Sequence, residues 1–330
     1  MNIGVDGGAL CTNQRFGNYI FTHNFIEAVG RYDKKNYYTV YTFCDVPPIF
    51  KNTRVHFKKL LPRKGWLQLR VSLEERLHKN DIFLALNQSI PSTNAKVISI
   101  SHGLSFEKFP DYYPASYSDL HQQLRLMLKK ASTILVSSKK VEEEFKALSE
   151  IPKVIAIPFG VPFDFLTKSR IQKRKNYFLF VGMDNQVKQI DVLVQYFIEF
   201  KKKYNKKKFE LWLVGNFKGP FPSSVRVIKQ ATRIQLKKLY AEARAYVTTS
   251  KYESFNFPAL EALSQQCPVI GFSSAIIPEM QKYCLLVGTK KEFIKGLNKI
   301  TKKNVKRINV TQLKKEFSWK NYIENLKDLY

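Results

Sequence analysis

The feature that most constrains the fold of this chain is a repeated series of short apolar runs separated by helix-like stretches. The runs are apolar throughout rather than alternating, which is typical of strands buried on both faces of parallel sheets. They predict β-strands at Asn2–Asp6, Tyr37–Phe43, Arg54–Phe57, Asp81–Leu86, Lys96–Ile100, Thr133–Val136, Lys153–Ile157, Tyr177–Val181, Phe209–Val214, Val225–Ile228, Ala245–Thr248, Pro268–Phe272 and Cys284–Val287.

Helix-like stretches fall between several of these strands. In Asp191–Tyr204 the residues Leu193, Tyr196, Phe197 and Phe200 recur at i, i+3, i+4 and i+7, which is the apolar face of a helix. Further helices are predicted at Tyr19–Gly30, Ser116–Lys130 and Lys139–Leu148. Strands that alternate with helices in both halves predict two doubly wound α/β domains. In such sheets ligands bind at the carboxyl ends of the strands, and we expect that site in a cleft between the domains.

Length and one polar segment support two domains. A chain of 330 residues is long enough for about two domains that each bury a core. The stretch Lys168–Lys175 (KSRIQKRK) is basic, has no apolar face and separates the two series of strands. It therefore predicts a linker.

Several classes of protein are excluded by what the sequence lacks. No apolar run approaches the roughly 20 residues that cross a bilayer, which argues against a membrane-spanning protein. The first residues, MNIGVDGGAL, lack the pattern of an export signal, so we do not expect export. Cys11, Cys44, Cys267 and Cys284 show no C-x-x-C spacing, so neither a disulfide framework nor a zinc site is indicated. A reducing compartment fits this cysteine pattern. We expect a cytoplasmic protein.

The positive charge is large and uneven. The formal net charge is +28, of which residues 1–168 carry 23 basic and 15 acidic side chains and the remainder 32 and 12. Such a field attracts nucleic acid, acidic lipid and nucleotide phosphates alike. The alternative is a solvated lysine surface, and the six lysines in Lys201–Lys208 suit that interpretation because they end a predicted helix.

The strongest candidate site is KYESFNFPALEALSQQCPVIGF, residues 251–272. Glu253 follows a predicted strand, and Pro258 suits the first position of a helix that would place Glu261 one turn inside its start. Backbone N–H groups of Ser254–Ala259 and the helix dipole favour an anion such as a diphosphate. Two carboxylates beside a phosphate-binding loop suit a sugar nucleotide, since carboxylates accept hydrogen bonds from ribose and hexose hydroxyls. The alternative is that the two glutamates are ordinary surface charges.

These residues carry a family resemblance. The run E-S-F-N-F-P-A-L-E-A-L, the C-P-V-I at 267–270 and the I-P-E at 277–279 resemble the donor-site signature of retaining GT-B glycosyltransferases, above all of glycosyltransferase family 4. That family commonly has E-G-F-G-x-P-x-x-E-A, so Ser254 and Asn256 replace its two glycines. Phe180–Lys188 (FVGMDNQVK) resembles V-G-R-x-x-x-x-K, with Lys188 at the lysine that contacts the donor diphosphate and Met183 at its partner arginine.

The first half carries weaker matches to the same family. Val97–Leu104 (VISISHGL) resembles its H-D-x motif, with His102 in place and Gly103 where aspartate is usual. Asp6–Asn18 resembles the glycine-containing first loop, in which Gly17 would let backbone approach the ligand. Pro158–Val161 (PFGV) resembles P-N-G-V, and Phe317–Tyr330 is similar to the terminal helix that crosses back onto the first domain.

The resemblance implies an α/β protein with the GT-B fold, in which two Rossmann-like domains with doubly wound parallel sheets face a cleft. It implies domains at 1–168 (acceptor side), 169–315 (donor side) and 316–330 (the returning helix). The implied activity is metal-independent transfer of a hexose, with retention, from a nucleotide-diphospho-sugar to a glycan or a lipid-linked acceptor. No cofactor is implied, and the sequence contains no D-x-D triplet.

The resemblance also assigns roles to residues. The catalytic residues are Glu253, His102 and Lys188: Glu253 would bind the hexose, Lys188 the diphosphate, and His102 would orient sugar and acceptor. Contacts to the base are expected within Val225–Gln235. Donor binding is implied for Glu261, which would hold the ribose, and for Ser254, Phe255, Asn256, Phe257, Gly182 and Gly17.

Three alternatives stay open at this point. Met183, Gly103 and Asn256 suit a GT-B protein that binds nucleotide or glycan without catalysis. The charge alone suggests a nucleic-acid binder, although no recognisable nucleic-acid-binding module is present. Leu60–Leu77 (LLPRKGWLQLRVSLEERL) predicts a basic, Trp-bearing amphipathic helix, which lies either on an anionic membrane at the inner face or with its leucines in the domain core.

Overall fold

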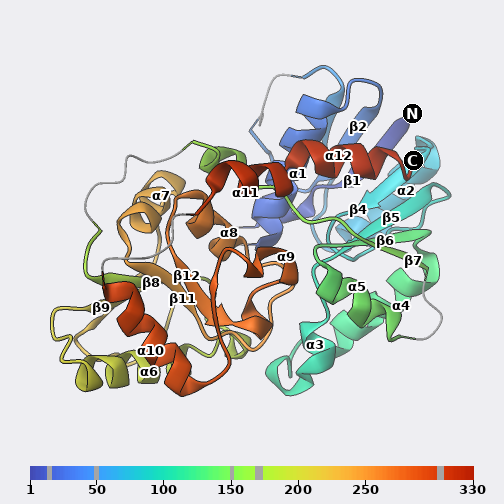
Figure 1. The fold of residues 1–330 in the computed structure, drawn as a ribbon. Coiled ribbons are helices and arrows are strands. Elements are labelled where there is room, and N and C mark those ends of the chain that lie inside the picture. Colours follow the sequence, from blue (N-terminus) through green and yellow to red (C-terminus); the bar gives the residue numbers. More distant parts are fainter. Residues whose placement is uncertain (13–16, 48–51, 149–151, 168–173, 303–307) are drawn as a thin grey trace. The chain divides into compact units, whose positions relative to one another are not determined.

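The computed structural model describes residues 1–12, 17–47, 52–148, 152–167, 174–302 and 308–330. It contains two compact units, which are described separately (Figure 1). Unit 1 comprises Met1–Gly160 and Ser318–Tyr330, and unit 2 comprises Val161–Phe317. Most of the predicted linker, residues 168–173, lies outside the described residues. Arg174 and Lys175 bind within unit 2, where the Arg174 guanidinium donates to the carbonyl groups of Ala243 and Gln266.

Unit 1 is built on a sheet of seven parallel strands in the order β3-β2-β1-β4-β5-β6-β7. Its register pairs Val5 of β1 with Val40 of β2 on one side and with Leu84 of β4 on the other. The strands are β1 (Asn2–Asp6), β2 (Tyr37–Thr42), β3 (Val55–Lys59), β4 (Ile82–Ala85), β5 (Lys96–Ser101), β6 (Thr133–Val136) and β7 (Lys153–Ala156).

Helices cover this sheet, and the last helix of the chain is one of them. The helices are η1 (Gly8–Cys11), α1 (Gly17–Tyr32), η2 (Trp66–Val71), α2 (Ser72–Leu77), α3 (Ser105–Lys108), η3 (Pro110–Tyr112), α4 (Tyr117–Lys130), α5 (Lys139–Lys146) and α12 (Trp319–Lys327). Helix α12 lies beside α1 (Figure 1), where Tyr322 packs edge-on against Phe21 and Phe25. The chain end is fixed by a hydrogen bond of 3.0 Å between the hydroxyls of Tyr330 and Tyr38.

Unit 2 repeats this plan with six parallel strands in the order β10-β9-β8-β11-β12-β13. The strands are β8 (Tyr177–Val181), β9 (Glu210–Val214), β10 (Val225–Ile228), β11 (Ala245–Thr248), β12 (Val269–Phe272) and β13 (Leu285–Val287). The other elements are η4 (Phe163–Phe165), η5 (Gln186–Lys188), α6 (Ile190–Lys203), α7 (Arg233–Glu242), α8 (Phe257–Ser264), η6 (Ser273–Ala275), α9 (Pro278–Gln281), α10 (Lys290–Thr301) and α11 (Val310–Glu316). The predicted face of α6 is confirmed, since Leu193, Phe197 and Phe200 are buried against Phe178.

The predicted fold class is therefore confirmed: the chain has two doubly wound parallel sheets, and its terminal helix returns to the first of them. The strands form where apolar runs occur because a strand covered by helices on both faces buries every side chain. Within the described residues, no helix is both long and apolar enough to cross a bilayer.

The cysteines differ from the expectation. Cys11 and Cys44 form a disulfide, with 5.6 Å between their Cα atoms, although the cysteine spacing indicated no disulfide framework, so that prediction is wrong for this pair. The physical reason is the strand order. Cys11 follows β1 and Cys44 follows β2, and these parallel neighbours end at the same edge of the sheet. Cys267 and Cys284 are not disulfide-bonded. The inference of a reducing compartment loses its support from the cysteine pattern.

Candidate active site

The candidate site of unit 2 lies where the order of strands in its sheet reverses. From β8 the chain builds outward through β9 and β10, and it then returns to place β11 on the other side of β8. The carboxyl ends of β8 and β11 therefore meet at the topological switch point, where open α/β sheets bind ligands. Lys188 follows β8 and Glu253 follows β11, so the topology brings together two residues that are 65 positions apart.

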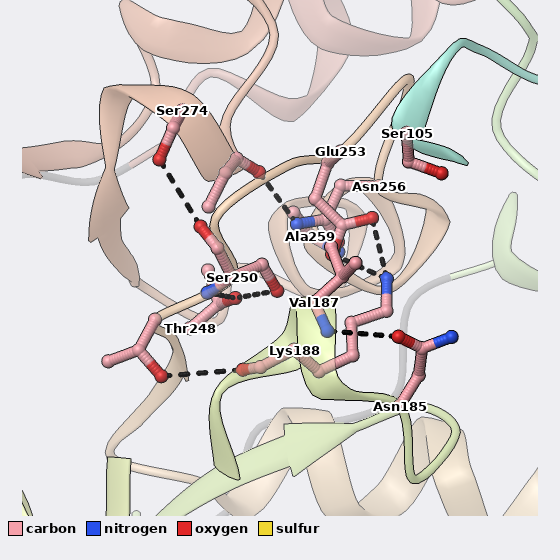
Figure 2. A network of polar contacts seen from close by, with 12 residues as sticks. Ser105, Asn185, Val187, Lys188, Thr248, Ser250, Glu253, Asn256, Ala259 and Ser274 are labelled. Carbon is pink, nitrogen blue, oxygen red and sulfur yellow. Dashed lines mark hydrogen bonds and ion pairs between the residues drawn. The ribbon is translucent and has the colours of Figure 1, made fainter. Parts of the chain in front are cut away.

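Lys188 and Glu253 form an ion pair at this point. The Lys188 amine donates to both carboxylate oxygens of Glu253, at 2.7 and 2.8 Å, and both side chains are largely buried. Figure 2 shows the lysine extending from its loop toward the carboxylate. The loop is fixed because the Asn185 side chain accepts from Val187 N at 2.9 Å and Thr249 donates to the Gln189 carbonyl at 2.9 Å. The residues predicted to bind the diphosphate and the hexose, Lys188 and Glu253, thus contact each other directly.

Asn256 caps helix α8, and its side chain is held by contacts within unit 2. Its backbone is left-handed, with φ of 72°, which is the conformation that favours glycine at this position in the family pattern. Its side-chain oxygen accepts from Ala259 N at 3.0 Å, and its amide donates to the Ala275 carbonyl at 2.9 Å (Figure 2). Asparagine therefore satisfies the turn and the helix start together. The helix begins at Phe257, so Pro258 takes its second position rather than the predicted first.

The aromatic side chains of the loop are packed inside unit 2. Phe255 and Phe257 are buried and pack edge to face, with ring centroids 4.9 Å apart, and Phe255 also packs against Phe317. The 254–257 loop lies at the positive end of the α8 dipole, which favours an anion there.

Glu261 lies on α8, buried to 2% exposure, within a polar cluster that the sequence did not reveal. Arg233 donates to one carboxylate oxygen at 2.8 Å, and the Tyr240 hydroxyl donates to the other at 3.2 Å. Burial raises the pKa of Glu261, against the opposing effect of the Arg233 charge. Arg233 also donates twice to Asp164, at 2.6 and 3.1 Å, and lies over the Phe165 ring.

Arg233 was missed because nothing local marks it as a partner of Glu261. Its only signal is its place at the start of α7, inside the segment 225–235 where base contacts are expected. The pair forms because α7 and α8 pack against each other.

Gly182 follows β8 as predicted, and its amide donates to the Val214 carbonyl at 3.0 Å. The neighbouring Gly215 has φ of 148°, and a Cβ there would lie 2.1 Å from the Gly182 carbonyl oxygen. Glycine is therefore required at 215 to let the ends of β8 and β9 approach. Met183, at the family's arginine position, is 41% exposed.

In unit 1, His102 lies after β5. Its Nε2 is 2.9 Å from the Leu86 carbonyl oxygen, and its ring packs edge-on against Phe21. A carbonyl only accepts, so Nε2 carries the proton and Nδ1 the lone pair. Burial lowers the pKa of His102 to about 4, so the ring is neutral at pH 7. A neutral ring with Nδ1 as acceptor suits an orienting role toward a hydroxyl group.

The switch point of unit 1 adds residues that sequence reasoning did not single out. Asp6 ends β1, is buried, and accepts from Gly8 N at 2.9 Å and from the Asn87 side chain at 3.2 Å. Burial raises the pKa of Asp6. Gly17, the predicted ligand-approaching glycine, is the first residue of α1, and a Cβ there would have no neighbour within 4 Å among the described residues.

The structure thus brings Lys188, Glu253 and the 254–257 loop together at one edge of unit 2. It places Glu261 on the helix that this loop begins, and His102 and Gly17 in unit 1. Their roles stay predictions. Among the described residues, no group of three or more His, Cys, Asp or Glu side chains could hold a metal ion.

Comparison with known proteins gives concordant matches. Residues 175–303 match the family described as Glycosyl transferases group 1. The O-antigen chain mannosyltransferase B of Escherichia coli is 25% identical over 230 residues, which are 62% of this chain and 60% of that protein. The chain therefore spans less than two thirds of this curated relative.

Solved structures match over the whole chain. Sucrose-phosphate synthase from Thermosynechococcus elongatus has a TM-score of 0.73 at 14% identity, covering 100% of this chain and 98% of that one. HepE of Anabaena, solved with UDP and glucose, has a TM-score of 0.71 at 15% identity and full coverage of both chains. The chain thus has the GT-B fold of these solved structures, and residues 175–303 of unit 2 are similar to the Glycosyl transferases group 1.

Proposed function

We propose that the chain is a retaining glycosyltransferase that moves a hexose from a nucleotide-diphospho-sugar to a glycan or a lipid-linked acceptor without a metal ion. The observation that carries the proposal is the ion pair of Lys188 and Glu253 at the switch point, beside the start of α8. It offers fixed positive charge for a diphosphate and a carboxylate for sugar hydroxyls within one hydrogen-bonded unit.

Donor binding would exchange the partners of this pair. In the structure the Lys188 charge is neutralised by Glu253. A diphosphate that reaches Lys188 would take over the ammonium group and leave Glu253 to accept hydrogen bonds from the hexose. The glycosyl–phosphate bond then breaks while the anomeric carbon bonds to the acceptor oxygen. The acceptor proton passes to an oxygen of the leaving diphosphate, on the same face of the sugar. Lys188 and the α8 dipole stabilise the charge that develops there.

Glu261 would hold the ribose only after part of its present coordination changes. Both carboxylate oxygens already accept hydrogen bonds, from Arg233 and Tyr240. The Arg233 side chain is 30% exposed and is shared with Asp164. Arg233 is therefore the partner that can turn toward a nucleotide and release one oxygen of Glu261.

The relatives support the donor and acceptor classes. HepE of Anabaena forms a complex with UDP and glucose, and the Escherichia coli relative is a mannosyltransferase of the O-antigen chain. A growing glycan, or a glycan on a lipid carrier, fits this set. A lipid-linked acceptor would place the reaction in the cytoplasm, at the inner face of a membrane.

Donor turnover tests the proposal. The purified chain is incubated with UDP-glucose, UDP-N-acetylglucosamine, GDP-mannose and ADP-glucose, and release of nucleoside diphosphate is measured by chromatography. We expect release from one donor class, even as slow hydrolysis, and at least about a hundredfold loss in Lys188→Met. Lys282→Met is the matched control, because Lys282 pairs with Glu316 at 2.6 Å elsewhere in unit 2. Equal turnover by Lys188→Met and the wild type would contradict the assignment.

The second candidate is a GT-B protein that binds nucleotide without transfer. Met183 favours it, because a thioether cannot replace the two parallel hydrogen bonds that arginine gives to phosphate. Binding of a nucleoside diphosphate with no release from any donor, with a glycan acceptor present or absent, would support this candidate over the enzyme.

A further inference from the structure

In the helical segment that follows β3 in unit 1, η2 and α2, two glutamates lie on the buried side and three leucines on the exposed side. Its inner side carries Trp66 and Val71, which are buried, but also Glu74 and Glu75. The Trp66 indole donates to the Thr42 carbonyl at 3.2 Å, which fixes that side against the sheet edge. Leu67 packs partly against the core, and the other three leucines of the segment lie on the exposed side.

Leu69, Leu73 and Leu77 are exposed and are spaced four residues apart, on successive turns of η2 and α2. Leu69 and Leu77 are 68% and 66% exposed, and Leu61, just before the helix, is 54% exposed. Of the twelve large hydrophobic residues exposed in the described part of the chain, these leucines make up four. Scattered single leucines are normal on a surface, whereas a row on one side of a helix needs a reason.

The exposed charges of the segment that carries this row have one sign. Both acidic residues of the segment are turned inward: Glu74 pairs with Lys58, and Glu75 accepts from Thr93 at 2.8 Å and from Asn80. The exposed formal charges between residues 61 and 79 are then all positive, on Arg63, Lys64, Arg76 and Lys79. We define the leucine face as Leu61, Leu69, Leu73 and Leu77 with these four cations.

We propose that the leucine face docks unit 1 onto an anionic membrane surface. Leucines that enter the interface between headgroups and acyl chains lose their contact with water, and the bordering cations meet acidic headgroups. This complementarity selects an anionic bilayer over a second copy of this face, because two copies would bring eight cations together. The inference rests on the geometry of unit 1 and does not depend on the transfer reaction.

Vesicle flotation of the purified full-length chain, without donor or acceptor, tests the proposal. Vesicles of phosphatidylcholine are compared with vesicles that contain about 30% phosphatidylglycerol, at which charge attraction is substantial. We expect flotation with the anionic vesicles only, weakened at high salt as the Debye length falls from about 10 Å at 0.1 M to about 3 Å at 1 M.

Two variants separate the contributions of the face. The triple substitution Leu69→Gln, Leu73→Gln and Leu77→Gln, and the quadruple substitution of the four cations by Gln, should each lower partitioning at least about tenfold. These side chains are exposed, so circular dichroism and melting temperature should match the wild type. The control for apolar exposure is Leu126→Gln with Ile198→Gln, and the control for charge is neutralisation of Lys202, Lys203, Lys207 and Lys208 in unit 2.

Each outcome decides the proposal. Loss in both face variants, with both controls binding like the wild type, supports it. Equal binding to neutral and anionic vesicles, absence of binding, or loss only in the lysine control would overturn it. A dimer in sedimentation velocity that the leucine variant abolishes, without vesicle binding, would show that the face joins two copies instead.

Discussion

Removal of Arg233 should leave a buried carboxylate without its charged partner. In the structure Arg233 donates to Glu261 at 2.8 Å, and the Glu261 side chain is 3% exposed. Breaking a buried pair by removing one partner costs about 3–5 kcal/mol, because the other charge stays desolvated. Arg233 is itself 30% exposed, and the Tyr240 hydroxyl still donates to Glu261 in the variant, so we discount the figure. Arg233→Met should lower the free energy of unfolding of unit 2 by about 2–3 kcal/mol at pH 8.

The loss of stability in Arg233→Met should depend on pH, because the substitution changes the pKa of Glu261. Burial already raises the pKa of Glu261, and loss of the Arg233 charge raises it further. A carboxyl whose folded pKa lies above its unfolded pKa takes up a proton on folding. Its contribution to stability therefore increases as the pH falls through the folded pKa. The deficit of Arg233→Met should shrink between pH 8 and pH 5, and Glu261→Gln added to Arg233→Met should restore part of the stability at pH 8.

The assay is urea unfolding followed by circular dichroism, with hydrogen exchange of unit 2 peptides to assign the change to that unit. Lys282→Met is the matched control, since its pair with Glu316 is exposed and should contribute less than about 1 kcal/mol. The reasoning is refuted if Arg233→Met costs no more than Lys282→Met, or if its deficit grows as the pH falls.

Three further predictions concern single positions. Asn256→Ala should lower the free energy of unfolding by about 2–3 kcal/mol, and Asn256→Gly by about 1 kcal/mol less because glycine tolerates φ of 72°; equal losses in urea unfolding would contradict the strain argument. Met183→Arg, at an exposed position, should tighten binding of the preferred nucleoside diphosphate about tenfold in calorimetry through a bidentate phosphate contact, and unchanged affinity would show that the position lies away from the phosphates. Alkylation of the unreduced, denatured chain should spare Cys11 and Cys44, and Cys11→Ser should cost about 2–4 kcal/mol by release of the loop constraint; labelling of all four cysteines would refute the pairing.

The strands and the main helices could be predicted from the sequence because each depends on a local pattern. β1, β6, β8, β10 and β11 have the predicted bounds, since a strand that is buried on both faces must be apolar along its whole length. Glu261 could likewise be placed one turn inside α8, because helix starts carry local signals such as Pro258.

What the sequence could not show depends on which elements become neighbours. Lys188 meets Glu253 only because β11 pairs with β8, and Cys11 meets Cys44 only because β1 pairs with β2. The period of the segment 60–77 predicts a helix but not which side it buries. The sheet edge accepts Trp66 and two carboxylates with partners, and Leu69, Leu73 and Leu77 stay exposed.

Calorimetric titration of the purified chain with UDP, GDP and ADP tests the central claim, a donor site built on Lys188 and Glu253, most directly. The account predicts that one of these nucleoside diphosphates binds, that the corresponding monophosphate binds at least about tenfold more weakly, and that Lys188→Met loses at least about tenfold in affinity while Lys282→Met does not. The absence of binding by all three nucleotides, or equal affinity in Lys188→Met and the wild type, would contradict it.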